Sequence, residues 1–266
     1  MSSDFFADTY IDAKGESHNL SAMDSYELPQ DFLLGPGPEI KKEIIDFQKT
    51  KLRDYNGLYA CVLDNVLSAT ECQQLIRAAE WRTKGVWEQA MVNIGNGNQA
   101  FYPETRDCGR IIWDDRDLVA KIFARCEASV PEILELKDKA RITGYGPVKR
   151  KETWRLSRLN ERMRFLKYVE GNYFRPHCDG SFATAGNEEI SWYTLHLYLN
   201  ESDQDSQLEG GATTFHSMNM LFEHDVVPKT GRVLIFQHRD LLHAGADVYG
   251  GVKYTMRTDL MYKKVE

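Results

Sequence analysis

The chain has 266 residues, 42% of them hydrophobic and 27% charged, with a formal net charge of −7. The acidic balance argues against duplex nucleic acid as the main partner, because a phosphate backbone attracts basic surfaces. No apolar run approaches a membrane span, and the N-terminus shows neither the basic nor the apolar region of a secretory signal. Five scattered cysteines without a CxxC pair argue against a disulfide framework and a zinc–thiolate site. We therefore expect a cytoplasmic or nuclear protein that contacts no membrane.

The sequence predicts one domain behind a polar leader. Residues 1–37 are mostly polar and end in a Gly-Pro-Gly-Pro cluster that breaks regular structure, which predicts an extended leader outside the core. A chain of this length buries a sizeable core without disulfides, so we assign residues 38–266 to a single domain. Within it, we expect residues 38–160 to supply helical support and residues 161–266 to form the β-core.

Three segments of the first half have the pattern of helices. Apolar residues recur at helical spacing over residues 39–50, which predicts a short amphipathic helix. Ser68 and Glu71 have the spacing of a capping box, which predicts a helix over residues 69–80. A further helix is expected over residues 115–129. These helices would form a layer that supports a β-sheet.

The second half is a series of short strands separated by Gly, Asn, Asp and Ser clusters. We expect strands over residues 164–169, 173–178, 192–200, 212–216, 232–237 and 252–262. Short strands with turn residues at this spacing are typical of a β-sandwich or barrel.

One strand in this series carries a pair of candidate metal ligands. His177 and Asp179 are two residues apart at the end of an extended segment, so their side chains should point to the same face. An imidazole and a carboxylate make two-thirds of the 2-His-1-carboxylate triad that binds non-haem Fe(II). The third ligand must therefore come from another part of the chain.

Two later histidines are candidates for the third ligand. An apolar, β-branched strand over residues 233–236 is followed by His238 and His243. The next strand places Lys253 and Arg257 on one face, because alternate strand residues point the same way. That face would carry two cations toward the cavity that holds the metal.

The order and spacing of four of these residues resemble a known family. His177, Asp179, His243 and Lys253, with the lysine ten residues after the last histidine, are similar to the prolyl 4-hydroxylase-like branch of the Fe(II)/2-oxoglutarate dioxygenases. The resemblance implies a mainly β fold with supporting helices, built on a double-stranded β-helix or jelly-roll core. It also favours His243, because His238 would place Lys253 fifteen residues on.

The resemblance implies Fe(II) as cofactor, 2-oxoglutarate as cosubstrate and L-ascorbate as a candidate reductant. Lys253 and Tyr198 resemble the cation and hydroxyl that hold the distal carboxylate of 2-oxoglutarate, and Tyr168 and Thr213 match further cosubstrate-lining positions. Arg257 would approach the metal-proximal end of the cosubstrate or the substrate, or pair with an acid. For the two tyrosines, the alternative is aromatic core packing. No catalytic side chain beyond the metal ligands is required.

Substrate contacts are predicted only weakly. A turn-rich segment over residues 93–99 is expected near the mouth of the site, and Arg110 beyond it is the candidate substrate contact. The alternative for Arg110 is an arginine on the surface or in a salt bridge. Residues 137–164 are locally basic, which indicates either a solvated face or a rim that attracts an anionic substrate or cosubstrate.

These expectations define the function that the resemblance implies. The chain would oxidise, and most simply hydroxylate, an unactivated C–H bond with O₂, releasing succinate and CO₂. The substrate would be a small or medium-sized molecule, or a prolyl or amino-acid group. One alternative is a catalytically silent relative that binds a ligand or partner in the same pocket, and another is a cupin-like metalloprotein with non-redox chemistry.

Overall fold

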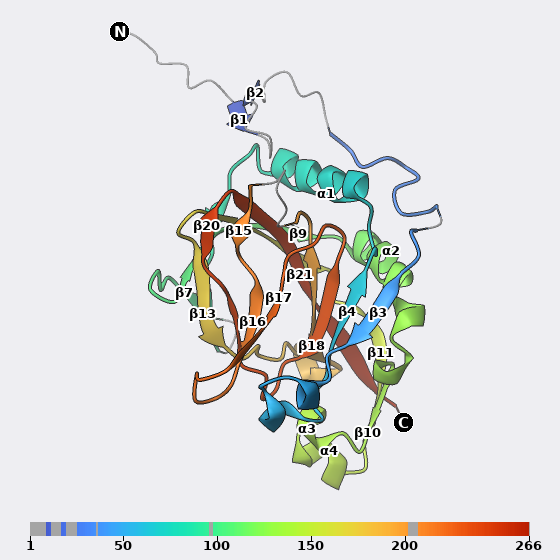
Figure 1. Cartoon of the computed structure of the whole chain (residues 1–266). Coiled ribbons are helices and arrows are strands. Elements are labelled where there is room, and N and C mark those ends of the chain that lie inside the picture. The colour runs from blue at the N-terminus through green and yellow to red at the C-terminus, as the bar shows by residue number, and fades with distance from the viewer. Residues whose placement is uncertain are drawn as a thin grey trace.

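The computed structural model describes residues 9–11, 17–19, 26–35, 37–95, 98–201 and 207–265. Within these ranges, a larger antiparallel sheet faces a smaller one, and helices cover the outer side of the larger sheet (Figure 1). No helix of the described residues is long and apolar enough to cross a membrane.

The larger sheet contains 10 strands among the described residues. In spatial order its central path is β3 (Lys41–Ile44), β4 (Ala60–Asp64), β18 (Val233–Gln237), β14 (Glu189–Tyr198), β21 (Val252–Val265), β12 (Arg162–Val169), β9 (Gly109–Asp114) and β5 (Glu88–Gln89). The sheet is extended by β11 (Thr153–Leu159), which pairs with β21, and by β10 (Glu135–Lys137), which pairs with β11.

The smaller sheet has the order β17 (Glu223–Val226), β16 (Thr213–His216), β19 (His243–Gly245), β13 (Tyr173–His177) and β8 (Arg106–Asp107). From β12 onward the chain passes repeatedly from one sheet to the other, so that strands distant in sequence become neighbours. This arrangement is the predicted jelly-roll core, and the strands expected from residue 164 onward are confirmed.

Shorter elements complete the described chain. Three antiparallel strand pairs lie outside the two sheets: β1 (Thr9–Ile11) with β2 (Ser17–Asn19), β6 (Val92–Gly95) with β7 (Asn98–Ala100), and β15 (Glu209–Gly210) with β20 (Val248–Gly250). The α-helices are α1 (Ala69–Arg82), α2 (Arg116–Cys126), α3 (Ala140–Thr143) and α4 (Tyr145–Lys149). The 3₁₀ turns are η2 (Phe47–Lys49), η3 (Arg53–Tyr55), η4 (Glu127–Ser129), η5 (Pro131–Ile133) and η6 (Ala185–Asn187).

The two longer helices confirm two predictions. Ser68 accepts from the backbone N–H of Glu71, and Glu71 accepts from the backbone N–H of Ser68, so the capping box that starts α1 is complete. Asp115 caps α2 with a single bond, its side chain accepting from the backbone N–H of Leu118. Both helices bury apolar side chains in the same core cluster as the outer face of the larger sheet.

Strand alternation separates this outer core from the inside of the jelly roll. In β18, Val233 and Ile235 join the core under the helices, whereas Leu234 and Phe236 face the space between the sheets. The same alternation in β21 sends apolar residues outward and polar ones inward. The interior therefore receives a row of polar side chains on a buried β-scaffold.

Two predictions for the N-terminal half are corrected by the structure. Residues 39–50 form β3 and η2 instead of a helix, because the segment adds an edge strand to β4 and thereby satisfies its backbone hydrogen bonds. Phe32 and Leu33 of the predicted leader are buried in the core under the helices, so this part is not outside the core. The remainder of the leader lies mostly outside the described residues.

Candidate active site

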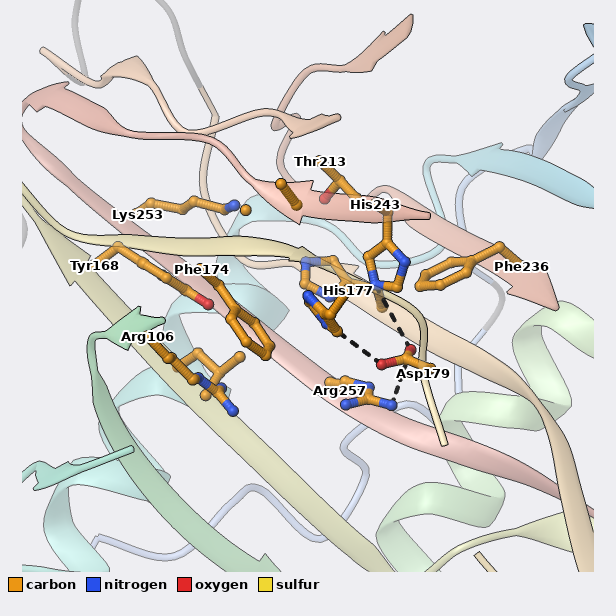
Figure 2. Close-up of a pocket in the computed structure, with 14 residues that line it drawn as sticks. Arg106, Tyr168, Phe174, His177, Asp179, Thr213, Phe236, His243, Lys253 and Arg257 are labelled. Atoms are coloured by element: carbon orange, nitrogen blue, oxygen red, sulfur yellow. Dashed lines mark ion pairs between the residues drawn. The ribbon is translucent and has the colours of Figure 1, made fainter. Parts of the chain in front are cut away.

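Three side chains with metal-binding atoms converge inside the jelly roll. His177 is the last residue of β13, Asp179 follows it in the next turn, and His243 is the first residue of β19. The two strands are antiparallel neighbours in which His177 lies opposite His243, with 4.4 Å between the ring centroids. One ligand atom from each of the three residues lies within 4.8 Å of the others, and Figure 2 shows the convergence.

The backbone fixes the orientation of both imidazoles. Nδ1 of His177 lies 2.9 Å from the carbonyl oxygen of Arg175, and Nδ1 of His243 lies 3.0 Å from that of Leu241. A ring nitrogen that faces a carbonyl carries the proton, so the lone pair of each ring is on Nε2. Burial lowers the pKa of His243 to about 3, which keeps this ring neutral. Both Nε2 atoms are therefore available as metal ligands.

Asp179 supplies the carboxylate of the set, and its side chain is 3% exposed. Burial alone would raise its pKa, but the Arg257 guanidinium beside it holds the pKa of Asp179 well below its usual range. Oδ2 accepts from Thr194 Oγ1 at 2.5 Å and lies 2.9 Å from Arg257 Nη2. Oδ1 instead faces Nε2 of His177 at 3.6 Å. This donor set, two imidazole nitrogens and one carboxylate oxygen, fits Fe(II).

Lys253 is the second unusual feature of the cavity. It lies on β21, is 1% exposed, and lines the same cavity as the three candidate ligands. Its Nζ is 5.0 Å from the ring centroid of Tyr168, and no carboxylate of the described residues pairs with it. Burial lowers the pKa of Lys253 to about 8. A buried ammonium without an acid partner fits the distal carboxylate of a dicarboxylate ligand, because such a charge is costly unless it is paired.

The predicted cosubstrate residues occupy different places around Lys253. Tyr168 and Thr213 line the cavity. Tyr198 is fully buried and is not among the residues that line this cavity, but its hydroxyl donates to Thr213 Oγ1 at 2.6 Å. Thr213 therefore accepts from Tyr198 and keeps its own hydroxyl proton for a group in the cavity.

The predicted third ligand and the alternative histidine are clearly separated. His243 belongs to the candidate metal-binding cluster, whereas His238 is buried with Nε2 3.7 Å from Oδ1 of Asp259. Arg257 lines the cavity and pairs with Asp179. Arg110 lies on β9, where its Nη1 donates to Gln99 Oε1 at 3.0 Å, and it is not among the residues that line the cavity.

Several lining residues were missed from the sequence. Arg106, Phe174 and His196 line the cavity. His196 could have been found, since it precedes Tyr198 by two residues on one strand and alternation places both on the inner face. Arg106 gave no such signal, because it belongs to the two-residue strand β8 at the edge of the smaller sheet.

Comparisons with known proteins agree with this geometry. Residues 163–258 match the family model described as the 2OG-Fe(II) oxygenase superfamily. No curated protein matches the chain. Among solved structures, a prolyl-4-hydroxylase from Pseudomonas putida is 16% identical, with 80% of this chain and 97% of that chain covered and a TM-score of 0.51.

A second similar structure is a prolyl hydroxylase from Trichoplax adhaerens, in complex with a peptide fragment of the hypoxia inducible factor oxygen degradation domain. It is 14% identical, with 78% of this chain and 86% of that chain covered and a TM-score of 0.50. At these identities the two likenesses show a shared fold.

The separation of His243 from His238 predicts their roles in metal binding. Replacing His243 by Ala should weaken Mn(II) or Fe(II) binding more than about a hundredfold, because one of three ligands is lost; removal of outer contacts alone costs 10–100-fold. His238→Ala should leave metal affinity within a few-fold of the unmodified protein. Anaerobic calorimetric titration of both variants measures this, with circular dichroism as the folding control. A loss confined to His238→Ala would move the third ligand to that residue.

Proposed function

We propose that the chain, a 2-oxoglutarate-dependent dioxygenase whose residues 163–258 match the 2OG-Fe(II) oxygenase superfamily, hydroxylates an unactivated C–H bond and releases succinate and CO₂. The observation that carries this proposal is the placement of the His177, Asp179 and His243 cluster in one cavity with an unpaired, buried Lys253. The cluster offers ligands for a metal, and the lysine offers a partner for a carboxylate of 2-oxoglutarate. The proposed reaction requires both the metal and this cosubstrate.

In this proposal His177, Asp179 and His243 hold Fe(II) through two Nε2 atoms and one carboxylate oxygen. Lys253 holds the distal carboxylate of 2-oxoglutarate, and the Thr213 hydroxyl donates to it. When bound, Fe(II) and 2-oxoglutarate supply the activation of O₂, and the protein supplies placement. Leu166, Phe174 and Phe236 give the cavity an apolar wall beside these polar groups.

Lys253, rather than Arg257, is the proposed anchor of the distal carboxylate. Both residues lie on the inner face of β21. Four residues of strand separate their Cα atoms by roughly 13 Å, so the two side chains contact different parts of the cavity. Arg257 pairs with Asp179 and therefore lies at the metal end of the cavity. Its proposed role is to hold the Asp179 carboxylate ionised and oriented, and to border the metal-proximal part of the cosubstrate.

We propose that the substrate is a small or medium-sized molecule, or a prolyl or amino-acid group. The cavity is lined by apolar side chains such as Phe174 and Phe236 together with a few charged groups, which is typical of small-molecule sites. The Trichoplax adhaerens structure contains a peptide fragment, which supports keeping peptidyl groups in the test. L-ascorbate is proposed as a reductant that maintains Fe(II).

Turnover of 2-oxoglutarate tests the proposed function. Protein supplied with Fe(II), 2-oxoglutarate, ascorbate and O₂ should form succinate, and the true substrate in a panel of amino acids, small metabolites and prolyl peptides should increase succinate and yield an oxygenated product in equal amount. Asp179→Ala is the matched control and should abolish both. Absence of Fe(II)-dependent succinate throughout the panel would favour a binding protein without this activity.

The pKa of Lys253 predicts how cosubstrate affinity depends on pH. Below about pH 8 the free protein already carries the ammonium that the carboxylate requires, so this residue adds no pH dependence there. Above it the ammonium must be regained on binding, and 2-oxoglutarate affinity should fall by up to about tenfold per pH unit until the pKa of the complex is reached.

A titration of the Mn(II)-loaded protein with 2-oxoglutarate between pH 6.5 and 9.5 checks this expectation. Lys253→Arg is the control, because a guanidinium stays charged over the whole window and should remove the decline. An equally steep decline in Lys253→Arg would show that another group titrates.

A further inference from the structure

We propose that the substrate carries an oxyanion, in the simplest case a carboxylate, and that Arg106 binds it. This inference rests on the proposed function, because it names the class of substrate that the same cavity accepts. It assigns a role to a buried charge that neither the metal nor the cosubstrate needs.

Arg106 is a buried arginine in a setting without an acid. It is 7% exposed, and it lines the cavity from β8 at the edge of the smaller sheet. Its protein contacts are neutral: Nε donates to Cys108 Sγ at 3.4 Å, Nη1 donates to the carbonyl oxygen of Met91 at 3.4 Å, and the Tyr168 hydroxyl also contacts the side chain. Among the described residues, no carboxylate forms an ion pair with it. A buried cation in such a setting is costly unless an anion arrives from outside.

The guanidinium lies close to the metal site but not at the place assigned to the cosubstrate's distal carboxylate. Its Cζ is 4.5 Å from the ring centroid of Phe174, and that ring stacks on His177 with 3.7 Å between the centroids. One aromatic ring therefore separates Arg106 from a metal ligand. Lys253 enters the cavity from the larger sheet instead, and Figure 2 shows the two cations approaching from different strands.

Formal charges around the cavity favour an anionic substrate. The charged residues that line it are Arg106, Lys253, Arg257 and Asp179. Arg257 and Asp179 compensate each other as an ion pair, and Fe(II) compensates the two negative charges of 2-oxoglutarate. Two positive charges remain in a buried setting, where they interact more strongly than in water. A substrate that brings a negative group would be stabilised there, and a cationic one would be repelled.

The chemistry of arginine narrows the kind of anion. A guanidinium presents parallel N–H donors that match the two oxygens of a carboxylate or a phosphate. The Arg106 guanidinium is one ring away from His177, so a molecule bound there by its oxyanion would extend toward the metal with its C–H bonds. Arg106 would in this way position the substrate and exclude analogues that carry an amide in place of the acid.

Simple oxyanions test the proposal without knowledge of the substrate. The protein loaded with Mn(II) and N-oxalylglycine, which occupies the cosubstrate site, is titrated calorimetrically with acetate, with inorganic phosphate and with acetamide. We expect saturable acetate binding, no acetamide binding, and a loss of acetate affinity of about ten- to a hundredfold in Arg106→Gln. Saturable phosphate binding of comparable affinity would extend the substrate class to phosphate esters, and its absence would limit it to carboxylates.

Two further variants keep the test independent of folding. Arg106→Lys retains the charge and should retain part of the acetate affinity, because only the paired donors are lost. Arg155→Gln is the matched control: Arg155 is exposed and pairs with Glu135 at 2.8 Å on the far end of the larger sheet, so acetate affinity should not change.

Distinct results would overturn the inference. Acetate that binds Arg106→Gln as tightly as the unmodified protein, or that fails to saturate the unmodified protein, removes Arg106 as an oxyanion site. A loss of N-oxalylglycine affinity in Arg106→Gln as large as the loss of acetate affinity would place Arg106 in the cosubstrate site. Succinate formation by the unmodified protein is measured separately. A failure of the proposed function can therefore be distinguished from a failure of the inference about Arg106.

Discussion

The pairing of β13 with β19 is the constraint on which the site depends, because it sets His177 opposite His243 across two antiparallel strands. Neither histidine could bind a metal with the other if the register shifted by one residue, since successive strand residues point to opposite faces. Backbone carbonyls two residues upstream then hold each ring by Nδ1. The smaller sheet therefore fixes the positions of two candidate ligand atoms.

The larger sheet supplies the charges that this arrangement requires. Its inner face carries Thr194 and Arg257, which bind one oxygen of Asp179 and leave the other facing His177. Farther along the same strand as Arg257 lies Lys253, whose charge is buried without an acid partner among the described residues. Such a buried, unpaired charge lowers the stability of the fold, and functional sites typically retain destabilising groups of this kind because the groups bind a ligand.

The sequence predicted the jelly-roll fold, and it singled out as candidate metal ligands three residues that the structure brings together, because both follow from local periodicity and from the resemblance. Sequence-based prediction was wrong where the structure of a segment depends on pairing with a strand distant in sequence. Residues 39–50 have a helical pattern, but hydrogen bonding to the open edge of β4 makes residues 41–44 a strand. Arg110 was the predicted substrate contact, but Arg106 lines the cavity; nothing local shows that a two-residue strand joins the smaller sheet while β9 joins the larger one. The role of Tyr198 stays a prediction: its ring centroid lies 5.9 Å from Lys253 Nζ, and its hydroxyl donates to Thr213.

A crystal structure with Mn(II) and 2-oxoglutarate, grown without O₂, is the most direct test of the central claim. The account predicts the metal on Nε2 of His177, Nε2 of His243 and one oxygen of Asp179, with the distal carboxylate of 2-oxoglutarate within hydrogen-bond distance of Lys253 Nζ. A metal bound through His238, or a cosubstrate whose distal carboxylate lies against Arg257 or Arg106 instead, would contradict it.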